Sequence, residues 1–135
     1  MSADKRFVDS NVFLYVLSGD AAKARVAEDI IRSGGMVSVQ VLNEIVSVGR
    51  RKLRAEWSTV HDLLNAIAMQ FRILPLSFAV HEFAVRLSQK NGLSIYDANI
   101  VAAADLAGCD TLFTEDLNNG QRIGSVAIRN PFMPV

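Results

Sequence analysis

Four acidic residues stand where a short apolar run ends or where a helix is expected to begin: Asp9, Glu44, Asp97 and Asp116. Asp9 directly follows the apolar run that ends at Val8, and Asp116 follows a later run in a polar loop. Neither Glu44 nor Asp97 has a Lys or Arg three or four residues away. A carboxylate among apolar neighbours needs a partner or a metal, because burying an unpaired charge is costly. We therefore expect the four acids to converge on a cation.

The cation that fits these oxygen ligands is Mg²⁺ or Mn²⁺. Two carboxylates about 4 Å apart repel each other by on the order of 4 kcal/mol at an effective dielectric constant of about 20. A cluster of carboxylates therefore requires a positive charge. Zinc is disfavoured, because His61, His81 and Cys109 lack zinc-ligand spacing. We interpret both histidines as helix-surface residues. A metal held by acids suits hydrolysis of a phosphodiester, since it polarises the phosphate and lowers the pKa of an attacking water.

Polar neighbours of these acids have supporting roles in this hypothesis. Ser10, Asn11 and Thr114 stand beside them in the sequence and can orient water or phosphate. Glu115 adjoins Asp116 and is a spare ligand candidate.

Each acid also has a purely structural explanation. Asp9 can cap a short helix that starts near Asn11. Asp97 completes Ser94-x-x-Asp97, which resembles a capping box. Asp116 can brace its own loop, and Glu44 can face solvent. Only the convergence of all four favours a site.

The basic residues are concentrated in one stretch, although Lys+Arg and Asp+Glu are both 14 and the net charge is zero. Zero net charge does not favour a nucleic-acid binder. However, a local basic strip can bind an RNA backbone without sequence preference. The alternative is a solvated helix C-terminus, which cations favour. No aromatic residue is interleaved, so base stacking is not indicated. The stretch comprises Arg50, Arg51, Lys52 and Arg54.

Short apolar runs alternate with stretches of helical periodicity. Strands are expected at 6–8, 36–39, 71–74, 111–113 and 125–129. Helices are expected near 11 and at 21–33, 40–52, 56–70, around 80–91 and at 94–107. Such alternation predicts an α/β fold with parallel strands covered by helices on both faces. Ligands of such sheets gather beyond the carboxyl ends of the strands.

Length and composition predict one domain spanning residues 1–135. Half of the residues are apolar, and part of that surface can face a partner. The single cysteine, Cys109, permits no intramolecular disulfide and is expected to be a small buried residue. We find no apolar run of signal or membrane-spanning length, so a cytoplasmic location is expected.

The sequence resembles the PIN-domain ribonucleases, particularly the toxins of VapBC-type toxin–antitoxin pairs. Four segments carry the resemblance, in the order in which the family has them. They are Phe7-Val8-Asp9-Ser10-Asn11-Val12, Ser38-Val39-Gln40-Val41-Leu42-Asn43-Glu44, Ser94-Ile95-Tyr96-Asp97-Ala98 with Ile100–Ala104, and Thr114-Glu115-Asp116. Asn99 departs from the pattern, since an apolar residue is expected there; it either lies in the metal's outer shell or faces water.

The resemblance implies a Rossmann-like three-layer PIN fold with a mainly parallel central sheet. It also implies cleavage of RNA dependent on Mg²⁺ or Mn²⁺, with the four acids as metal ligands and catalytic residues. A homodimer and an inhibiting antitoxin are the implied protein partners.

Two alternatives differ in class. A phosphoacceptor receiver domain also gathers acids at the carboxyl edge of a parallel sheet and binds Mg²⁺. It requires paired acids after the first strand and a late lysine, and this chain has no lysine beyond Lys90. The second alternative is a non-catalytic PIN-like module that binds RNA or protein only.

Overall fold

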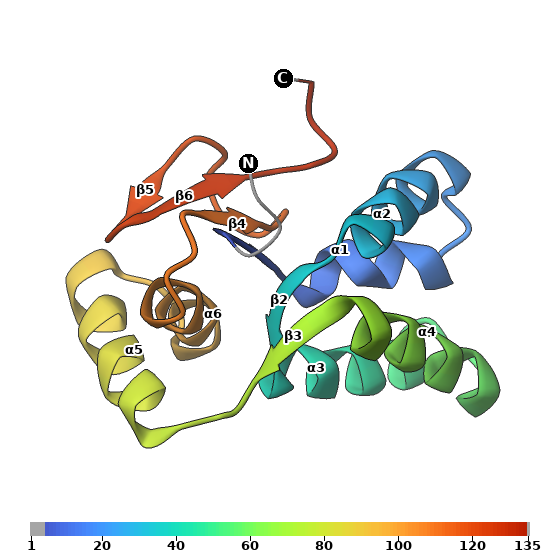
Figure 1. Cartoon of the computed structure of the whole chain (residues 1–135), viewed down its shortest axis with the longest axis horizontal. Coiled ribbons are helices and arrows are strands. Elements are labelled where there is room, and N and C mark those ends of the chain that lie inside the picture. The colour runs from blue at the N-terminus through green and yellow to red at the C-terminus, as the bar shows by residue number, and fades with distance from the viewer. Residues whose placement is uncertain (1–4, 135) are drawn as a thin grey trace.

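The computed structural model describes residues 5–134, which form one six-stranded sheet with helices on both of its faces (Figure 1). The strands are β1 (Arg6–Val8), β2 (Gly35–Ser38), β3 (Phe71–Leu74), β4 (Thr111–Phe113), β5 (Arg122–Ile123) and β6 (Val126–Arg129). The helices are α1 (Ser10–Leu14), α2 (Ala21–Ser33), α3 (Val39–Arg51), α4 (Trp57–Gln70), α5 (Phe78–Asn91) and α6 (Ile95–Leu106), with a 3₁₀ turn, η2 (Tyr15–Leu17), after α1.

The strand order is β3-β2-β1-β4-β6-β5, and every pair except β5–β6 is parallel. The chain leaves β1 toward one side of the sheet and returns to β4 on the other, so the strand order reverses between these two strands. In register, Val8 pairs with Phe113, and Phe113 pairs with Arg129. The residues that follow β1 and β4 therefore lie side by side at the edge where doubly wound sheets bind ligands.

The sheet is the middle of three layers. Helices α5 and α6 lie on one side of it, and α1 to α4 lie on the other (Figure 1). Helix α6 packs against β2, β4 and β6 and is buried along most of its length, because small side chains let it approach the sheet closely. Its buried residues are Ala98, Ile100, Val101, Ala102, Ala103 and Ala104. This architecture confirms the predicted α/β class with a mainly parallel sheet.

Every expected helix and strand is present, some with slightly shifted bounds. The structure also contains one strand, β5, that was not expected. Strand β2 ends at Ser38 instead of Val39, because Val39 is already the first residue of α3. Gly34 ends α2 at φ +77°, and a Cβ there would lie 2.5 Å from the carbonyl oxygen of Gln70. Strand β5 was not expected: two residues are too short for a periodicity signal, and they are held only by antiparallel pairing with β6.

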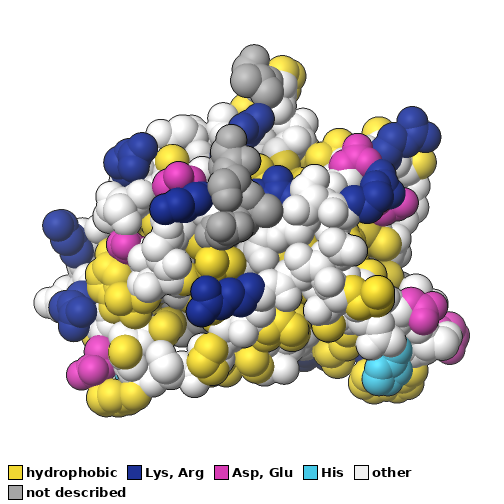
Figure 2. All heavy atoms as spheres, in the orientation of Figure 1, with side chains coloured by type: hydrophobic (Ala, Val, Ile, Leu, Met, Phe, Trp, Pro, Cys, Tyr) yellow, Lys and Arg dark blue, Asp and Glu magenta, His cyan; other side chains and the backbone are white. Residues whose placement is uncertain are grey.

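Two minor predictions are confirmed, one for the histidines and one for the cysteine. His61 and His81 are exposed on α4 and α5. Cys109 is buried, and burial raises the pKa of its thiol to about 11. Within residues 5–134, no helix is both long and apolar enough to cross a membrane. On the face drawn in Figure 2, Lys and Arg side chains are dispersed over the surface and do not form one continuous strip.

Candidate active site

Asp9 lies at the end of β1 and is 5% exposed. Its backbone N–H donates to the carbonyl of Phe113 across 3.0 Å, which joins the ends of β1 and β4. Oδ1 accepts from the backbone N–H of Ser10 at 2.7 Å, so Asp9 is the N-cap of α1. Oδ2 accepts from the Thr114 hydroxyl at 2.9 Å and from the side-chain amide of Asn11 at 3.3 Å. The capping role considered from the sequence is present, and it holds the carboxylate at the sheet edge.

Glu44 projects from α3 and is half-buried. The Ser10 hydroxyl lies 3.3 Å from Glu44 Oε2 and 3.4 Å from Asp9 Oδ1, so it can donate to either acid. Gln40, one helical turn earlier, places its amide nitrogen 3.4 Å from Glu44 Oε1 and 3.3 Å from the carbonyl of Tyr96. Gln40 thus connects α3 to the start of α6. Sequence reasoning missed this residue, although its i, i+4 spacing from Glu44 was a usable signal.

Asp97 lies in the first turn of α6, and its backbone N–H donates to Ser94 Oγ across 3.1 Å. This is one half of the capping box expected from the sequence. Asp116 lies on the exposed loop after β4, where its backbone N–H donates to Thr114 Oγ1 across 3.1 Å. Asp97 and Asp116 are therefore fixed through their backbones, which leaves their carboxylates available.

The four acids perturb one another electrostatically. Burial raises the pKa of Asp9 to about 7, and the charges of Glu44 and Asp116 contribute in the same direction. Burial also raises the pKa of Glu44, with smaller contributions from Asp97 and Asp116. The pKa of Asp97 is raised by burial and by Asp116. No Lys or Arg of the described chain offsets these effects. The structure thus joins Asp9 and Glu44 through Ser10, and the charges of Asp97 and Asp116 both act on Glu44.

The donor chemistry of this cluster fits a hard divalent cation, because the side chains offer carboxylate oxygens and no nearby cation neutralises them. A closed ligand shell is not preformed: within residues 5–134, no three Asp, Glu, His or Cys side chains are close enough to enclose a metal ion. The assignment of the four acids as metal ligands remains a prediction.

The supporting residues separate into two groups. Ser10, Asn11 and Thr114 all contact the Asp9 carboxylate. Glu115, the spare ligand candidate, is held elsewhere: Oε1 accepts from the Tyr15 hydroxyl at 2.6 Å, and Oε2 lies 2.8 Å from Lys23 Nζ. These contacts favour a structural role for Glu115.

Asn99 follows Asp97 on the same helix, and its amide oxygen Oδ1 is buried without a hydrogen-bond partner among the described residues. The interpretation that Asn99 simply faces water is therefore wrong for this atom. An outer-shell role remains a prediction.

The basic stretch lies at the end of α3 and in the turn before α4. Arg50 donates to the carbonyl of Ala55 at 2.7 Å, and its guanidinium lies 4.7 Å from the ring centroid of Trp57. Arg51 donates to Ser47 Oγ, whereas Lys52 and Arg54 are exposed. No aromatic residue is interleaved within the stretch itself, but α4 begins at Trp57, and its ring, 51% exposed, lies over Arg50.

A cleft of about 210 Å³ is lined by Asn11 and Glu115, which neighbour candidate acids in the sequence, and by Lys52 of the basic stretch. None of the four acids lines it, and its walls, which include Leu53, are mostly apolar. Its remaining lining residues are Leu14, Tyr15, Ser18 and Val48.

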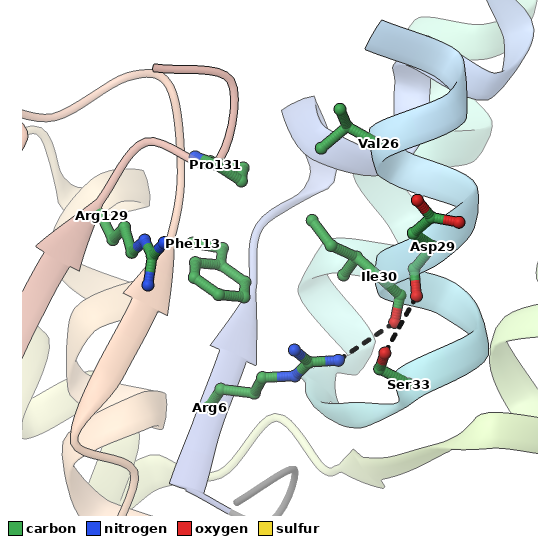
Figure 3. A pocket seen from close by; sticks show the side chains of 8 residues that line it. All are labelled: Arg6, Val26, Asp29, Ile30, Ser33, Phe113, Arg129 and Pro131. Carbon is green, nitrogen blue, oxygen red and sulfur yellow. Dashed lines mark hydrogen bonds between the residues drawn. The ribbon is translucent and has the colours of Figure 1, made fainter. Parts of the chain in front are cut away.

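A separate hollow of about 380 Å³ lies between α2 and strands β1, β4 and β6 (Figure 3). Its Arg6 donates to the carbonyls of Gly34 and Ile30 at 2.7 and 3.2 Å, so this side chain satisfies the last turn of α2. Arg6 and Arg129 lie 5.5 and 5.8 Å from the ring centroid of Phe113. The only acid lining this hollow is Asp29, which pairs with Arg32. None of the four clustered acids lines it.

Comparison with known proteins agrees with this geometry. A family model described as the PIN domain matches residues 6–122. No curated protein matches the chain in a direct sequence search. Solved structures with similar folds include a toxin–antitoxin complex from Klebsiella pneumoniae, at 24% identity and a TM-score of 0.71, covering 94% of this chain and 98% of the other.

Two further similar structures come from other bacteria. Rickettsia felis VapBC2 bound to a DNA fragment from its promoter is 17% identical, with a TM-score of 0.66 and coverage of 93% of this chain and 97% of the other. Mycobacterium tuberculosis VapC20, described as a sarcin-ricin loop cleaving toxin, is 19% identical, with a TM-score of 0.61 and coverage of 82% and 89%. At these sequence identities the likeness shows a shared fold and nothing more.

Proposed function

Because this chain belongs to the PIN-domain family, we propose that it is a metal-dependent endoribonuclease and the toxin of a toxin–antitoxin pair. One observation carries the proposal: Asp9 and Glu44 share the Ser10 hydroxyl at the carboxyl edge of β1 and β4, and the charges of Asp97 and Asp116 contribute to the raised pKa of Glu44. In this proposal the four carboxylates are both metal ligands and catalytic residues.

The cation would be Mg²⁺ or Mn²⁺, held by these four acids. When bound, such an ion polarises the phosphate and lowers the pKa of an attacking water. The chain's own contribution is to hold the ligands in place. Thr114 and Asn11 fix one oxygen of Asp9, while Gln40 fixes one oxygen of Glu44. Ser10 sits between these two acids and orients whichever one it donates to.

RNA is the proposed substrate, and we propose that it approaches the acids over the cleft lined by Asn11, Glu115 and Lys52. Lys52 lines this cleft, and the exposed Arg51 and Arg54 add positive charge in the same stretch. A phosphate backbone needs such charge, because the acids alone repel it. Arg50 is occupied by Ala55 and Trp57, which assigns it a positioning role in this stretch.

Protein partners are part of the same proposal. The structural neighbours from Klebsiella pneumoniae and Rickettsia felis are toxin–antitoxin assemblies, which supports an antitoxin for this chain. A homodimer is proposed as well. Exposed apolar side chains offer surface for both contacts, among them Phe78 at 73% and Tyr96 at 70% exposure. A cytoplasmic location remains a prediction.

The alternatives have less support. A phosphoacceptor receiver domain needs a lysine beside its acids, and no described Lys or Arg makes a hydrogen bond to any of the four. A non-catalytic binding module has no use for four mutually repelling carboxylates, which destabilise the fold without a cation.

The test is cleavage of a mixed structured RNA by purified protein with Mg²⁺, with Mn²⁺ and with EDTA, beside Asp9→Asn. Cleavage that requires metal and is lost in the variant supports the proposal. Absence of cleavage in every lane, together with no Mn²⁺ binding by calorimetry, would favour the non-catalytic module.

A further inference from the structure

Four side chains from distant parts of the chain form a cluster that we name the Lys23 clamp: Tyr15, Lys23, Glu115 and Phe132. Lys23 Nζ lies 2.8 Å from Glu115 Oε2 and 3.1 Å from the Tyr15 hydroxyl. The Tyr15 hydroxyl in turn donates to Glu115 Oε1 across 2.6 Å. Both oxygens of the Glu115 carboxylate are therefore bound, one by a cation and one by a neutral donor.

The clamp is held by aromatic packing as well as by hydrogen bonds. Lys23 Nζ lies 4.6 Å from the Tyr15 ring centroid and 5.3 Å from that of Phe132. The two rings meet edge to face, with centroids 4.8 Å apart. Side-chain exposure is 36% for Lys23 and 24% for Glu115, so solvent screens this ion pair only in part. Because the ion pair also packs against two aromatic rings and Glu115 accepts a second hydrogen bond, the Glu115 side chain is held in one geometry.

Glu115 is covalently joined to Asp116, and the backbone around both is anchored to the acid cluster. The N–H of Glu115 donates to Asn11 Oδ1 at 3.1 Å, and that of Asp116 donates to Thr114 Oγ1 at the same distance. Asn11 and Thr114 also bind the Asp9 carboxylate. The clamp and the acid cluster therefore share the segment 114–116, one on each side.

Asp116 needs such an anchor more than the other three acids do. It is exposed, it lies outside any helix or strand, and its carboxylate accepts no hydrogen bond among the described residues. Its charge contributes to the raised pKa values of Asp9, Glu44 and Asp97, so all three repel it. Repulsion from three acids drives a loop carboxylate outward unless the adjoining residue is held.

We propose that Lys23 and Tyr15 are positioning residues: by gripping Glu115, they hold the adjacent Asp116 at the acid cluster against the repulsion of the other carboxylates. The inference rests on the proposed function for its catalytic consequence, but its structural part concerns the metal-free protein alone. Neither residue touches the acids of the cluster. Their effect is transmitted through the Glu115 side chain and one peptide bond.

The test compares Lys23→Met and Tyr15→Phe with Arg25→Met, a matched control on the same helix. Arg25 is exposed and makes no side-chain hydrogen bond or ion pair among the described residues. Amide hydrogen exchange in metal-free protein is the first readout. We expect faster exchange across residues 115–119 in both clamp variants, with α6 and β1 unchanged. Equal exchange in Lys23→Met and Arg25→Met would overturn the proposal.

Mn²⁺ affinity, measured by calorimetry, is the second readout. We expect Lys23→Met to weaken binding about tenfold, the lower end of the effect of outer-shell partners of metal ligands. The double variant Lys23→Met/Glu115→Gln should be no weaker than Lys23→Met alone, because the two residues act as one unit. Additive losses would contradict the clamp. If the wild type neither binds Mn²⁺ nor cleaves RNA, the proposed function fails, while hydrogen exchange still decides the clamp.

Discussion

The side-chain amide of Asn11 donates to the hydroxyl of Thr114 across 3.0 Å, joining residues 103 positions apart. Thr114 is fully buried, and its hydroxyl makes one donated and two accepted hydrogen bonds. It donates to Asp9 Oδ2 and accepts from both Asn11 and the backbone of Asp116. One hydroxyl thus connects two acids of the candidate site, which follow the neighbouring strands β1 and β4.

Replacing this hydroxyl should be costly. Thr114→Val keeps the side-chain shape but leaves one buried oxygen of Asp9 without its donor. We expect a loss of about 1–3 kcal/mol in the free energy of unfolding, measured by urea denaturation. Thr111→Val is the control, since its hydroxyl donates only to the neighbouring Asp110. Equal losses of unfolding free energy in the two variants would show that the Thr114 hydrogen bonds stabilise the fold no more than the Thr111 hydroxyl does.

The raised pKa of Asp9 makes the stability of the metal-free protein depend on pH. Between the ordinary value of 3.8 and the folded value of about 7, the folded state binds more protons than the unfolded state. We therefore expect the free energy of unfolding to fall as pH rises through this window, by on the order of 4 kcal/mol.

Asp9→Asn should remove most of this decline, because asparagine caps a helix as well as aspartate and carries no charge. The variant should match the wild type near about pH 4 and exceed it in stability near about pH 8. Urea denaturation across this range is the measurement. Parallel stability profiles for the two proteins would contradict the buried, destabilising charge.

A bound metal ion should reverse this loss of stability at high pH. Mg²⁺ or Mn²⁺ stabilises the ionised carboxylates, so it should raise the melting temperature more near about pH 8 than near about pH 5, where protons compete for the ligands. EDTA should abolish the difference. A melting temperature that does not change on addition of Mn²⁺ at either pH would argue against the four acids as metal ligands.

Asp97→Asn should abolish cleavage without unfolding the chain. The contact that Asp97 makes to Ser94 comes from its backbone N–H, which asparagine retains. We expect a fall of about 10²-fold or more in cleavage rate, larger than for an outer-shell residue, with the urea midpoint near that of the wild type. Asp62→Asn, on the exposed face of α4, is the control. Unfolding of the Asp97 variant would favour the purely structural capping interpretation.

The exposed cations after α3 should determine the salt dependence of RNA binding. Removing Arg51 and Lys52 together should reduce the slope of log affinity against log salt by about 1.4, or about 0.7 for each single-strand phosphate contact. Arg72→Ala/Lys90→Ala removes two exposed cations elsewhere as the control. An unchanged slope would leave the stretch as a solvated helix end.

Much of this arrangement could be predicted from the sequence, because local signals coincide with the fold. The turn residues after Val8 and the N-cap at Ser94 place Asp9 and Asp97 on the correct elements. The i, i+4 spacing to Glu44 could have identified Gln40, but the contacts that Gln40, Tyr15 and Lys23 make with distant segments could not be found in this way. Their partners are Tyr96 and Glu115, and only the strand order brings those segments together. The ring of Trp57 over Arg50 was missed for a similar reason, since it depends on how sharply the chain turns between α3 and α4.

The insertion of β4 between β1 and β6 also has a consequence during protein synthesis. Asp9 leaves the ribosome before its partner Thr114, which follows more than a hundred residues later. Nascent chains fold from the N-terminus onward, and parallel pairings of high sequence separation form late. An incomplete chain that ends before β4 lacks the strand that brings these residues to Asp9. If the protein is a toxin, chains that end before β4 therefore lack its harmful activity, and only chains that extend through β4 require neutralisation.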